Sequence, residues 1–201
     1  MKLSQRMILV LTTVGLLSGC FLAGVGLLTE KPIQMNKQKE IREAIFEVVP
    51  QSNSTQKLLQ EEELSVYAGM DKNNKIRGLA VKSEGVGFQD KITLMYGTDP
   101  SLTRIFSLTI LEQSETPGLG AKITSEKEFL RFWQNKDCTQ KLSLQKPPVS
   151  SPEKLSSSEV NTITGATISS RSVLNIVNQS LKEVKQLREK GKLLSGEPNA
   201  N

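Results

Sequence analysis

The sequence predicts an α+β fold, in which an N-terminal transmembrane helix precedes a single domain of antiparallel strands and flanking helices. Three observations lead to this prediction. Residues 7–28 form an uncharged apolar run, β-branched and apolar segments follow one another in the middle of the chain, and helical patterns stand on either side of them. Strands gathered in one block with helices at both ends are typical of α+β proteins. About 170 residues follow the apolar run, which suits one domain.

The N-terminal apolar run is predicted to be an uncleaved transmembrane helix after a short tail, residues 1–6. Met7 to Leu28 carries no charge, and about 20 helical residues are enough to cross a bilayer core. A cleaved signal sequence is the alternative, because Leu17 to Cys20 resembles a lipobox in which Cys20 would be lipidated. However, the run stays apolar beyond Cys20, whereas the apolar region of a signal peptide has about 7–15 residues before polar chain.

A second helical pattern follows the apolar run. From Pro32 to Val49, apolar residues recur on one helical face, and Pro50 ends the pattern. Gln51 to Gln60 is predicted to be a polar break before the first strand.

The middle of the chain predicts two strand pairs. Lys72 to Asn74 is predicted to be a hairpin turn, and Thr98 to Ser101 separates the next two strands. The predicted strands are Leu64 to Asp71, Lys75 to Lys82, Lys91 to Gly97 and Ile105 to Glu112.

The last third of the chain predicts two helices separated by a loop. Ser125 to Glu128 has the pattern of a capping box, which predicts a short helix through about Gln134. Lys146 to Glu159 is rich in proline and serine and is predicted to be a loop. Apolar residues at helical spacing predict a long helix from about Ile168 to Lys190. The tail from Leu193 to Asn201 is predicted to be disordered.

The composition excludes several kinds of function. The chain has no histidine, so a histidine-based metal site, triad or general base is not available, and we identify no catalytic residue and no metal ligand. Cys20 and Cys138 cannot pair if one lies in the membrane and the other in the outer domain. The net charge of +5 comes partly from mixed charged runs without interleaved aromatics, which does not favour nucleic-acid binding. Phe132 and Trp133 are expected in the core.

The most informative motif is Thr164-Gly-Ala-Thr167, a small turn before the last predicted helix. Backbone N–H groups at a helix N-terminus are unpaired and attract anions. Gly165 and Ala166 leave room for a ligand, and Thr167 would place a hydroxyl at the mouth of the helix. A plain turn with a helix cap is the alternative, because the same residue types are favoured there without any ligand.

A second motif, Glu115-Thr-Pro-Gly-Leu-Gly120, has the proline and glycines of a turn. Such a turn lets the backbone approach a flat ligand closely, although the hexapeptide alone is equally typical of a surface loop. Gly85 to Phe88 is a weaker signal, since a glycine-containing bulge or turn needs no ligand.

Together, the two motifs resemble those of FMN-binding subunits in two membrane complexes, the G-type subunit of the Rnf complex and the C-type subunit of the Na⁺-translocating NADH:quinone oxidoreductase. The family motif is Asp-x-x-Ser/Thr-Gly-Ala-Thr. Thr164, Gly165, Ala166 and Thr167 match its last four positions, and Asn161 stands where Asp is usual. The resemblance implies that Thr167 carries FMN through a phosphoester bond made by a flavin transferase. It also implies that the second motif lies near the flavin, with binding residues Glu115, Thr116, Gly118, Leu119 and Gly120.

The same resemblance implies the setting of the protein. It implies an electron-transfer subunit with covalent FMN in an ion-translocating Rnf-type complex that couples ferredoxin and NAD, and that contains other membrane subunits. Basic residues on both sides of the apolar run leave its orientation open. The family places the FMN-binding domain, here residues 29–192, on the periplasmic (extracytoplasmic) side of the cytoplasmic membrane, with a single-pass anchor. A membrane-tethered or lipidated binding module without a redox role is the alternative.

Overall fold

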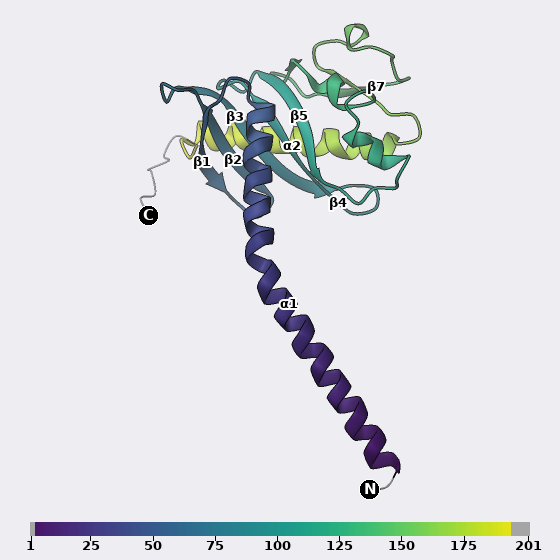
Figure 1. Ribbon diagram of the computed structural model, residues 1–201. Helices are drawn as coiled ribbons and strands as arrows, with labels where there is room; N and C mark the ends of the chain where they lie inside the picture. The colour runs from purple at the N-terminus through teal and green to yellow at the C-terminus, as the bar shows by residue number, and fades with distance from the viewer. Residues whose placement is uncertain (1–2, 194–201) are drawn as a thin grey trace. The chain divides into compact units, whose positions relative to one another are not determined.

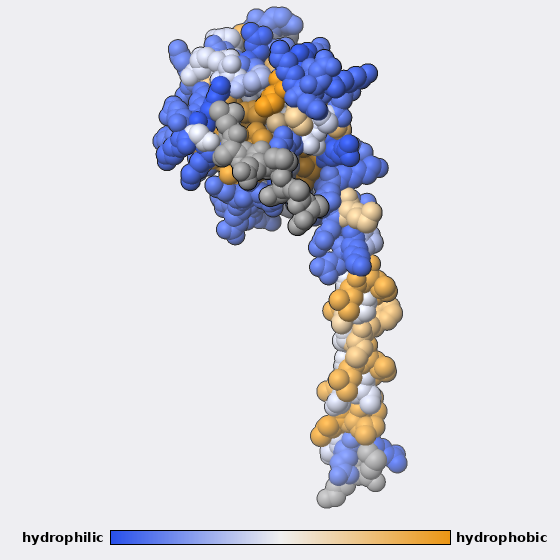
Figure 2. Space-filling view, turned by 90° about the vertical axis from the view of Figure 1, so that its left-hand side faces the viewer, coloured by the Kyte–Doolittle hydropathy of each residue, from blue (hydrophilic) through white to orange (hydrophobic). Residues whose placement is uncertain are grey.

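The computed structural model describes residues 3–193 and divides the chain into two units, Met1–Ile41 and Arg42–Asn201. Helix α1 (Leu3–Val48) supplies the described part of the first unit and the first residues of the second (Figure 1). Its large apolar side chains between Met7 and Leu28 are exposed, with polar stretches on either side, as Figure 2 shows. By length and composition, α1 is a candidate membrane-spanning helix.

Helix α1 runs without interruption through Pro32, where two helical segments were expected. An interior proline costs about 3 kcal/mol because it lacks an N–H and crowds the preceding turn. Good helix formers such as Leu, Glu, Lys, Gln and Met surround Pro32 and favour continuing the helix on both sides. The helix ends at Val48, two residues before Pro50, as a following proline predicts.

The second unit is built on a six-stranded antiparallel sheet whose strands neighbour one another in chain order. The four predicted strands are confirmed. In each of the two predicted turns an aspartate, Asp71 or Asp99, accepts backbone N–H groups. The polar break predicted at residues 51–60 is wrong for most of its length, because these residues pair with the edge of the sheet as strand β1. The strands are β1 (Ser54–Gln60), β2 (Leu64–Met70), β3 (Ile76–Val86), β4 (Lys91–Thr98), β5 (Arg104–Glu112) and β6 (Lys136–Asp137).

The two faces of this sheet are covered by different elements. Side chains alternate between faces along a strand. In β3, Gly85 lies against Ile176 of α2 (Thr167–Glu189), whereas Gly78 lies against Val49, the residue that follows α1. Helix α2 therefore covers one face, and the last turn of α1 packs on the other (Figure 1).

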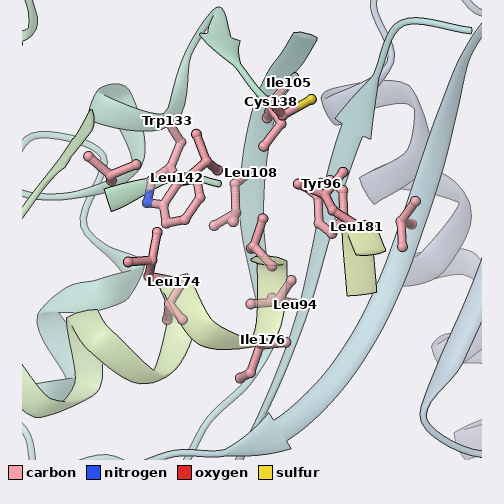
Figure 3. Close-up of a cluster of buried hydrophobic side chains, with 14 of the residues drawn as sticks. Leu94, Tyr96, Ile105, Leu108, Trp133, Cys138, Leu142, Leu174, Ile176 and Leu181 are labelled. Carbon is pink, nitrogen blue, oxygen red and sulfur yellow. The ribbon is translucent and has the colours of Figure 1, made fainter. Parts of the chain in front are cut away.

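The main core lies between the sheet and α2. Figure 3 shows Leu94 and Tyr96 of β4 and Leu108 of β5 gathered with Ile176 and Leu181 of α2. The Tyr96 hydroxyl is hydrogen-bonded to Ser180 of the helix at 2.9 Å. Phe132 and Trp133 are fully buried, which confirms that they belong to the core.

The segment between β5 and α2 contains short elements only. The helix predicted at 125–134 is instead a 3-10 turn, η2 (Leu130–Trp133), preceded by η1 (Gly120–Thr124). The Ser125 hydroxyl does accept the Glu128 N–H, as a capping box predicts, but three aromatic side chains of this stretch turn into the core and an amphipathic α-helix does not form. Strands β7 (Ser143–Gln145) and β8 (Glu159–Asn161) form a parallel pair around a loop with η3 (Pro152–Lys154).

The C-terminal helix is confirmed, since α2 begins one residue before the predicted start and ends one residue before the predicted end. Leu193, predicted to belong to a disordered tail, is buried in the core. The remainder of that predicted tail, residues 194–201, lies outside the described residues.

Candidate functional site

The two sequence motifs meet at one surface pocket of about 400 Å³. The end of β8 turns into α2 on one side of the pocket, and the loop between β5 and η1 forms another side. A third contribution comes from the connection between β3 and β4. The lining residues are Phe88, Thr116, Leu119, Gly120, Gly165, Ala166, Thr167, Ile168 and Ser169.

The Thr-Gly-Ala-Thr turn is held by hydrogen bonds within its own chain segment. The Ala166 N–H donates to the Ile163 carbonyl at 3.1 Å, and Gly165 adopts a positive φ of 79°, which favours glycine. The Ser170 hydroxyl accepts the Ile163 N–H and donates to the Ala166 carbonyl. Ser170 therefore stabilises the turn, and the side chain of Thr167 is left for another role.

The plain-cap explanation of Thr167 does not agree with this geometry. Thr167 is the first residue of α2, and the N-cap residue, Ala166, makes no side-chain cap bond. The first backbone bond of the helix joins the Ser170 N–H to the Ala166 carbonyl at 2.9 Å. The N–H groups of the first turn precede this bond and so lack helical partners. Thr167 is half-buried, and its hydroxyl has no hydrogen-bond partner within residues 3–193.

The second motif forms a tight turn at the edge of the pocket. The Thr116 carbonyl accepts the N–H groups of Leu119 and Ala121, both at 3.1 Å. Gly118 has a φ of 76°, so the unusual backbone angle lies here. Position 120 has room only for glycine, because a Cβ there would collide with the carboxylate of Glu115 and the hydroxyl of Ser169.

Glu115 lies beside the pocket rather than on its wall. Its side chain is only 4% exposed. Oε1 accepts the N–H groups of Phe88 at 2.6 Å and Gln89 at 3.2 Å, and Oε2 accepts the Ser169 hydroxyl at 2.5 Å. Glu115 therefore links the three chain segments that form the pocket.

The structure places the remaining predicted site residues in two groups. Six of them line the pocket: Thr116, Leu119, Gly120, Gly165, Ala166 and Thr167. Thr164 and Gly118 are exposed and lie in the two turns without lining the pocket.

Sequence reasoning missed three lining residues, Phe88, Ile168 and Ser169. Phe88 is 60% exposed, Ile168 53% and Leu119 50%. In the described part of the second unit, most of the exposed large apolar side chains therefore lie at this pocket. Exposed apolar patches of this kind are typical of binding sites. The Gly85-Val-Gly-Phe88 signal pointed to Phe88, but only as a glycine turn.

The chemistry of the pocket is that of binding. A hydroxyl and the positive end of a helix face it together with apolar side chains, and within residues 3–193 no ionisable side chain lines it. Cys138 lies elsewhere and is buried, which raises the pKa of its thiol to about 11 and keeps it protonated at neutral pH. The arrangement suits a phosphate attached to a flat, largely apolar group.

The comparison with known families agrees with this chemistry. Residues 87–182 match the FMN-binding domain family, and all nine lining residues fall inside that range. The region that matches this family follows an N-terminal apolar helix, α1.

Most of the chain is similar to the G-type subunits of ion-translocating oxidoreductase complexes. It is 25% identical to the G-type subunit of Methanosarcina acetivorans, over 89% of this chain and 93% of the relative. It is 28% identical to the G-type subunit of the Na⁺-translocating ferredoxin:NAD⁺ oxidoreductase complex of Acetobacterium woodii, over 92% and 94%. The resemblance inferred from the two motifs is confirmed.

Two solved structures share the fold. NqrC of Shewanella oneidensis superposes with a TM-score of 0.53 at 20% identity, over 70% of each chain. The C-type subunit of the Na⁺-translocating NADH-quinone reductase of Parabacteroides distasonis gives a TM-score of 0.58 at 15% identity, over 84% of this chain and 98% of the other. The predicted fold class, a helix followed by an antiparallel α+β domain, is confirmed.

Proposed function

We propose that this protein is the electron-carrying subunit of an Rnf-type, ion-translocating ferredoxin:NAD oxidoreductase complex, with FMN attached covalently to Thr167. The observation that carries the proposal is the convergence of both motifs on one pocket, where the Thr167 hydroxyl is not engaged by the rest of the described domain. The names of the G-type relatives support the kind of complex.

The residues of the pocket fit FMN. The phosphate would lie at the start of α2, where N–H groups without helical partners and the helix dipole favour an anion. The exposed side chains of Phe88, Leu119 and Ile168 offer apolar contacts of the kind a flavin ring needs. Gly165 and Gly120 line the pocket without a side chain, and a Cβ on Gly165 would lie 3.3 Å from Cδ2 of Leu119.

FMN supplies one- and two-electron transfer, whereas the protein binds, orients and shields it. Thr167 would fix the phosphate, and the apolar side chains would exclude water from one side of the ring. No acid–base step is assigned to this chain, because the pocket offers no ionisable side chain for one among the described residues.

The proposal includes a membrane setting. Helix α1 would anchor the protein once in the cytoplasmic membrane, with the FMN-binding domain on the extracytoplasmic side, in contact with other membrane subunits of the complex. A flavin transferase would form the phosphoester bond there. The covalent bond would prevent loss of FMN into a dilute external space.

In-gel fluorescence tests the attachment. The full chain is co-expressed with a flavin transferase and denatured, so that only covalent flavin remains on the band. We expect a fluorescent wild-type band and a dark Thr167→Ala band. Loss of an unbonded hydroxyl should change the free energy of unfolding by no more than about 0.5 kcal/mol, so the variant should remain folded.

Thr164→Ala is the matched control, since it removes a hydroxyl three residues away that does not line the pocket. It should keep fluorescence. A fluorescent Thr167→Ala band would refute attachment at Thr167. A dark wild-type band would favour the alternative, a tethered binding module without a redox role.

A further inference from the structure

The carboxylate of Glu115 is enclosed by the chain from two sides. A Cβ on Gly87 would collide with Oε1, and a Cβ on Gly120 would collide with Oε2. Each oxygen is also a hydrogen-bond acceptor, Oε1 for two backbone N–H groups and Oε2 for the hydroxyl of Ser169. Glycines on both sides and donors for both oxygens show that the fold is shaped around this carboxylate.

The donors to Glu115 belong to different chain segments that line the pocket. Phe88 presents its exposed ring to the pocket while its N–H bonds to Oε1. Ser169 stands in the first turn of α2, two residues after Thr167, so its buried hydroxyl points to a different side of the helix from Thr167. Glu115 itself precedes Thr116, Leu119 and Gly120, which form the remaining side.

The connection that carries Phe88 is a short turn between Val86 and Lys91, which pair across β3 and β4. Its own backbone bond is Gly87 N–H to the Asp90 carbonyl, at 2.8 Å, and Phe88, Gln89 and Asp90 are exposed. Its two hydrogen bonds to Oε1 join it directly to the other segments of the pocket. Without the Glu115 carboxylate, these two hydrogen bonds would be lost, and they would no longer hold Phe88 in position relative to the start of α2.

We propose that Glu115 is a positioning residue for the flavin: it touches no cofactor atom, but it holds Phe88 and the Thr167 turn at a set separation, so that the ring of Phe88 covers FMN attached at Thr167. This inference rests on the proposed function for the identity of the covered group. It replaces the expectation that Glu115 contacts the flavin directly.

Two substitutions separate positioning from loss of charge. Glu115→Gln keeps an oxygen for the N–H groups of Phe88 and Gln89, and its NH₂ group can donate to the Ser169 hydroxyl. Glu115→Ala removes both links. Glu62→Ala is the matched control, because Glu62 is an exposed glutamate outside the pocket.

The first measurement is iodide quenching of flavin fluorescence in the folded, full-length protein in detergent, well below its melting temperature. We expect Glu115→Ala to raise the quenching constant several-fold, and Glu115→Gln and Glu62→Ala to match the wild type. A purely structural role would lower the melting temperature of Glu115→Ala without changing quenching, and that result would overturn the proposal. If Glu115→Ala does not fold, Ser169→Ala is measured in its place. We expect it to raise the quenching constant too, but by less.

The second measurement needs no flavin. In the Thr167→Ala background, hydrogen exchange at the Phe88 and Gln89 amides should be several-fold faster with Glu115→Ala and unchanged with Ser169→Ala. Unchanged exchange with Glu115→Ala would overturn the link itself. A wild type that carries no covalent FMN would instead refute the proposed function, and the exchange result would still decide whether Glu115 ties the two segments together.

Discussion

Asn161 illustrates how a single side chain connects the loop before β8 to the last residue of that strand. It is 3% exposed, and its Oδ1 accepts the Val149 N–H while its Nδ2 donates to the Val149 carbonyl, both at 2.9 Å. The side-chain amide thus pairs with one residue's backbone in both directions. Aspartate, usual at this position in the family, has an acceptor for the N–H but, when ionised, no donor for the carbonyl.

This pairing predicts that Asn161→Asp destabilises the domain. At about pH 7 we expect a loss of about 1–3 kcal/mol, because the half-buried carbonyl of Val149 loses its donor and faces a carboxylate. Burial raises the pKa of the new carboxyl above its unfolded value, and its protonated form can donate. The deficit should therefore grow as pH rises through that folded-state pKa and be smaller near pH 4.

Denaturant unfolding at the two pH values measures the effect. Asn175→Asp, at an exposed position of α2, is the control and should change stability by less than about 0.5 kcal/mol. An Asn161→Asp protein as stable as the wild type at both pH values would show that the amide pair contributes nothing.

At the scale of elements, the last turn of α1 packs against glycines on three neighbouring strands. Gly69 and Gly78 are paired across β2 and β3, and the Cβ positions of both lie within 3.0 Å of Val49 Cγ1. Gly97 of β4 lies against the backbone carbonyl of Val48. Small residues here let a helix backbone lie directly on a sheet, which larger side chains would prevent.

The two kinds of contact predict different responses to an added methyl group. Gly69→Ala would meet mainly the Val49 side chain, so Val49→Ala should relieve part of its cost. Gly97→Ala would meet the backbone of Val48, and Val49→Ala should not relieve it. We expect each glycine substitution to cost about 1–3 kcal/mol, as overpacking does.

Unfolding of the single and double variants of the full-length protein provides a double-mutant cycle. Coupling between Gly69 and Val49 with no coupling between Gly97 and Val49 is the expected result. Equal coupling in both pairs would contradict the distinction between side-chain and backbone contact.

At the scale of the whole molecule, an apolar helix and a region that matches the FMN-binding domain family occur in one chain. The run from 7 to 28 continues past Cys20 into further helix, whereas lipoprotein processing would cut before that cysteine. We therefore expect the mature protein to keep the residues before Cys20.

Protease treatment of spheroplasts tests anchor and orientation together. If the domain lies outside and the anchor is uncleaved, the protease should remove the domain and leave a protected fragment that begins before Cys20. Cys20→Ala should behave identically. A mature N-terminus at Cys20, by intact mass, would establish lipoprotein processing, and a fully protected domain would place it in the cytoplasm.

The sequence by itself determined the elements whose signals are local. Turn residues at 72–74 and 98–101 specified the strand pairs, and 3.6-residue periodicity specified α2 to within a residue at either end. The apolar run identified the candidate membrane helix. The two glycine-containing motifs identified most of the pocket residues, because turns depend on the conformational preferences of a few adjacent residues.

Only the tertiary structure decided which residues surround the pocket and which groups donate hydrogen bonds to Glu115. Its bonds join residues 27 and 54 positions apart, and no local pattern predicts which distant donors a buried carboxylate will find. The edge strand β1 exists because β2 supplies its hydrogen bonds, although its own sequence is polar. Phe88 is an exposed residue in a glycine-containing turn. It lines the pocket because the packing of the sheet brings Glu115 and α2 next to this turn.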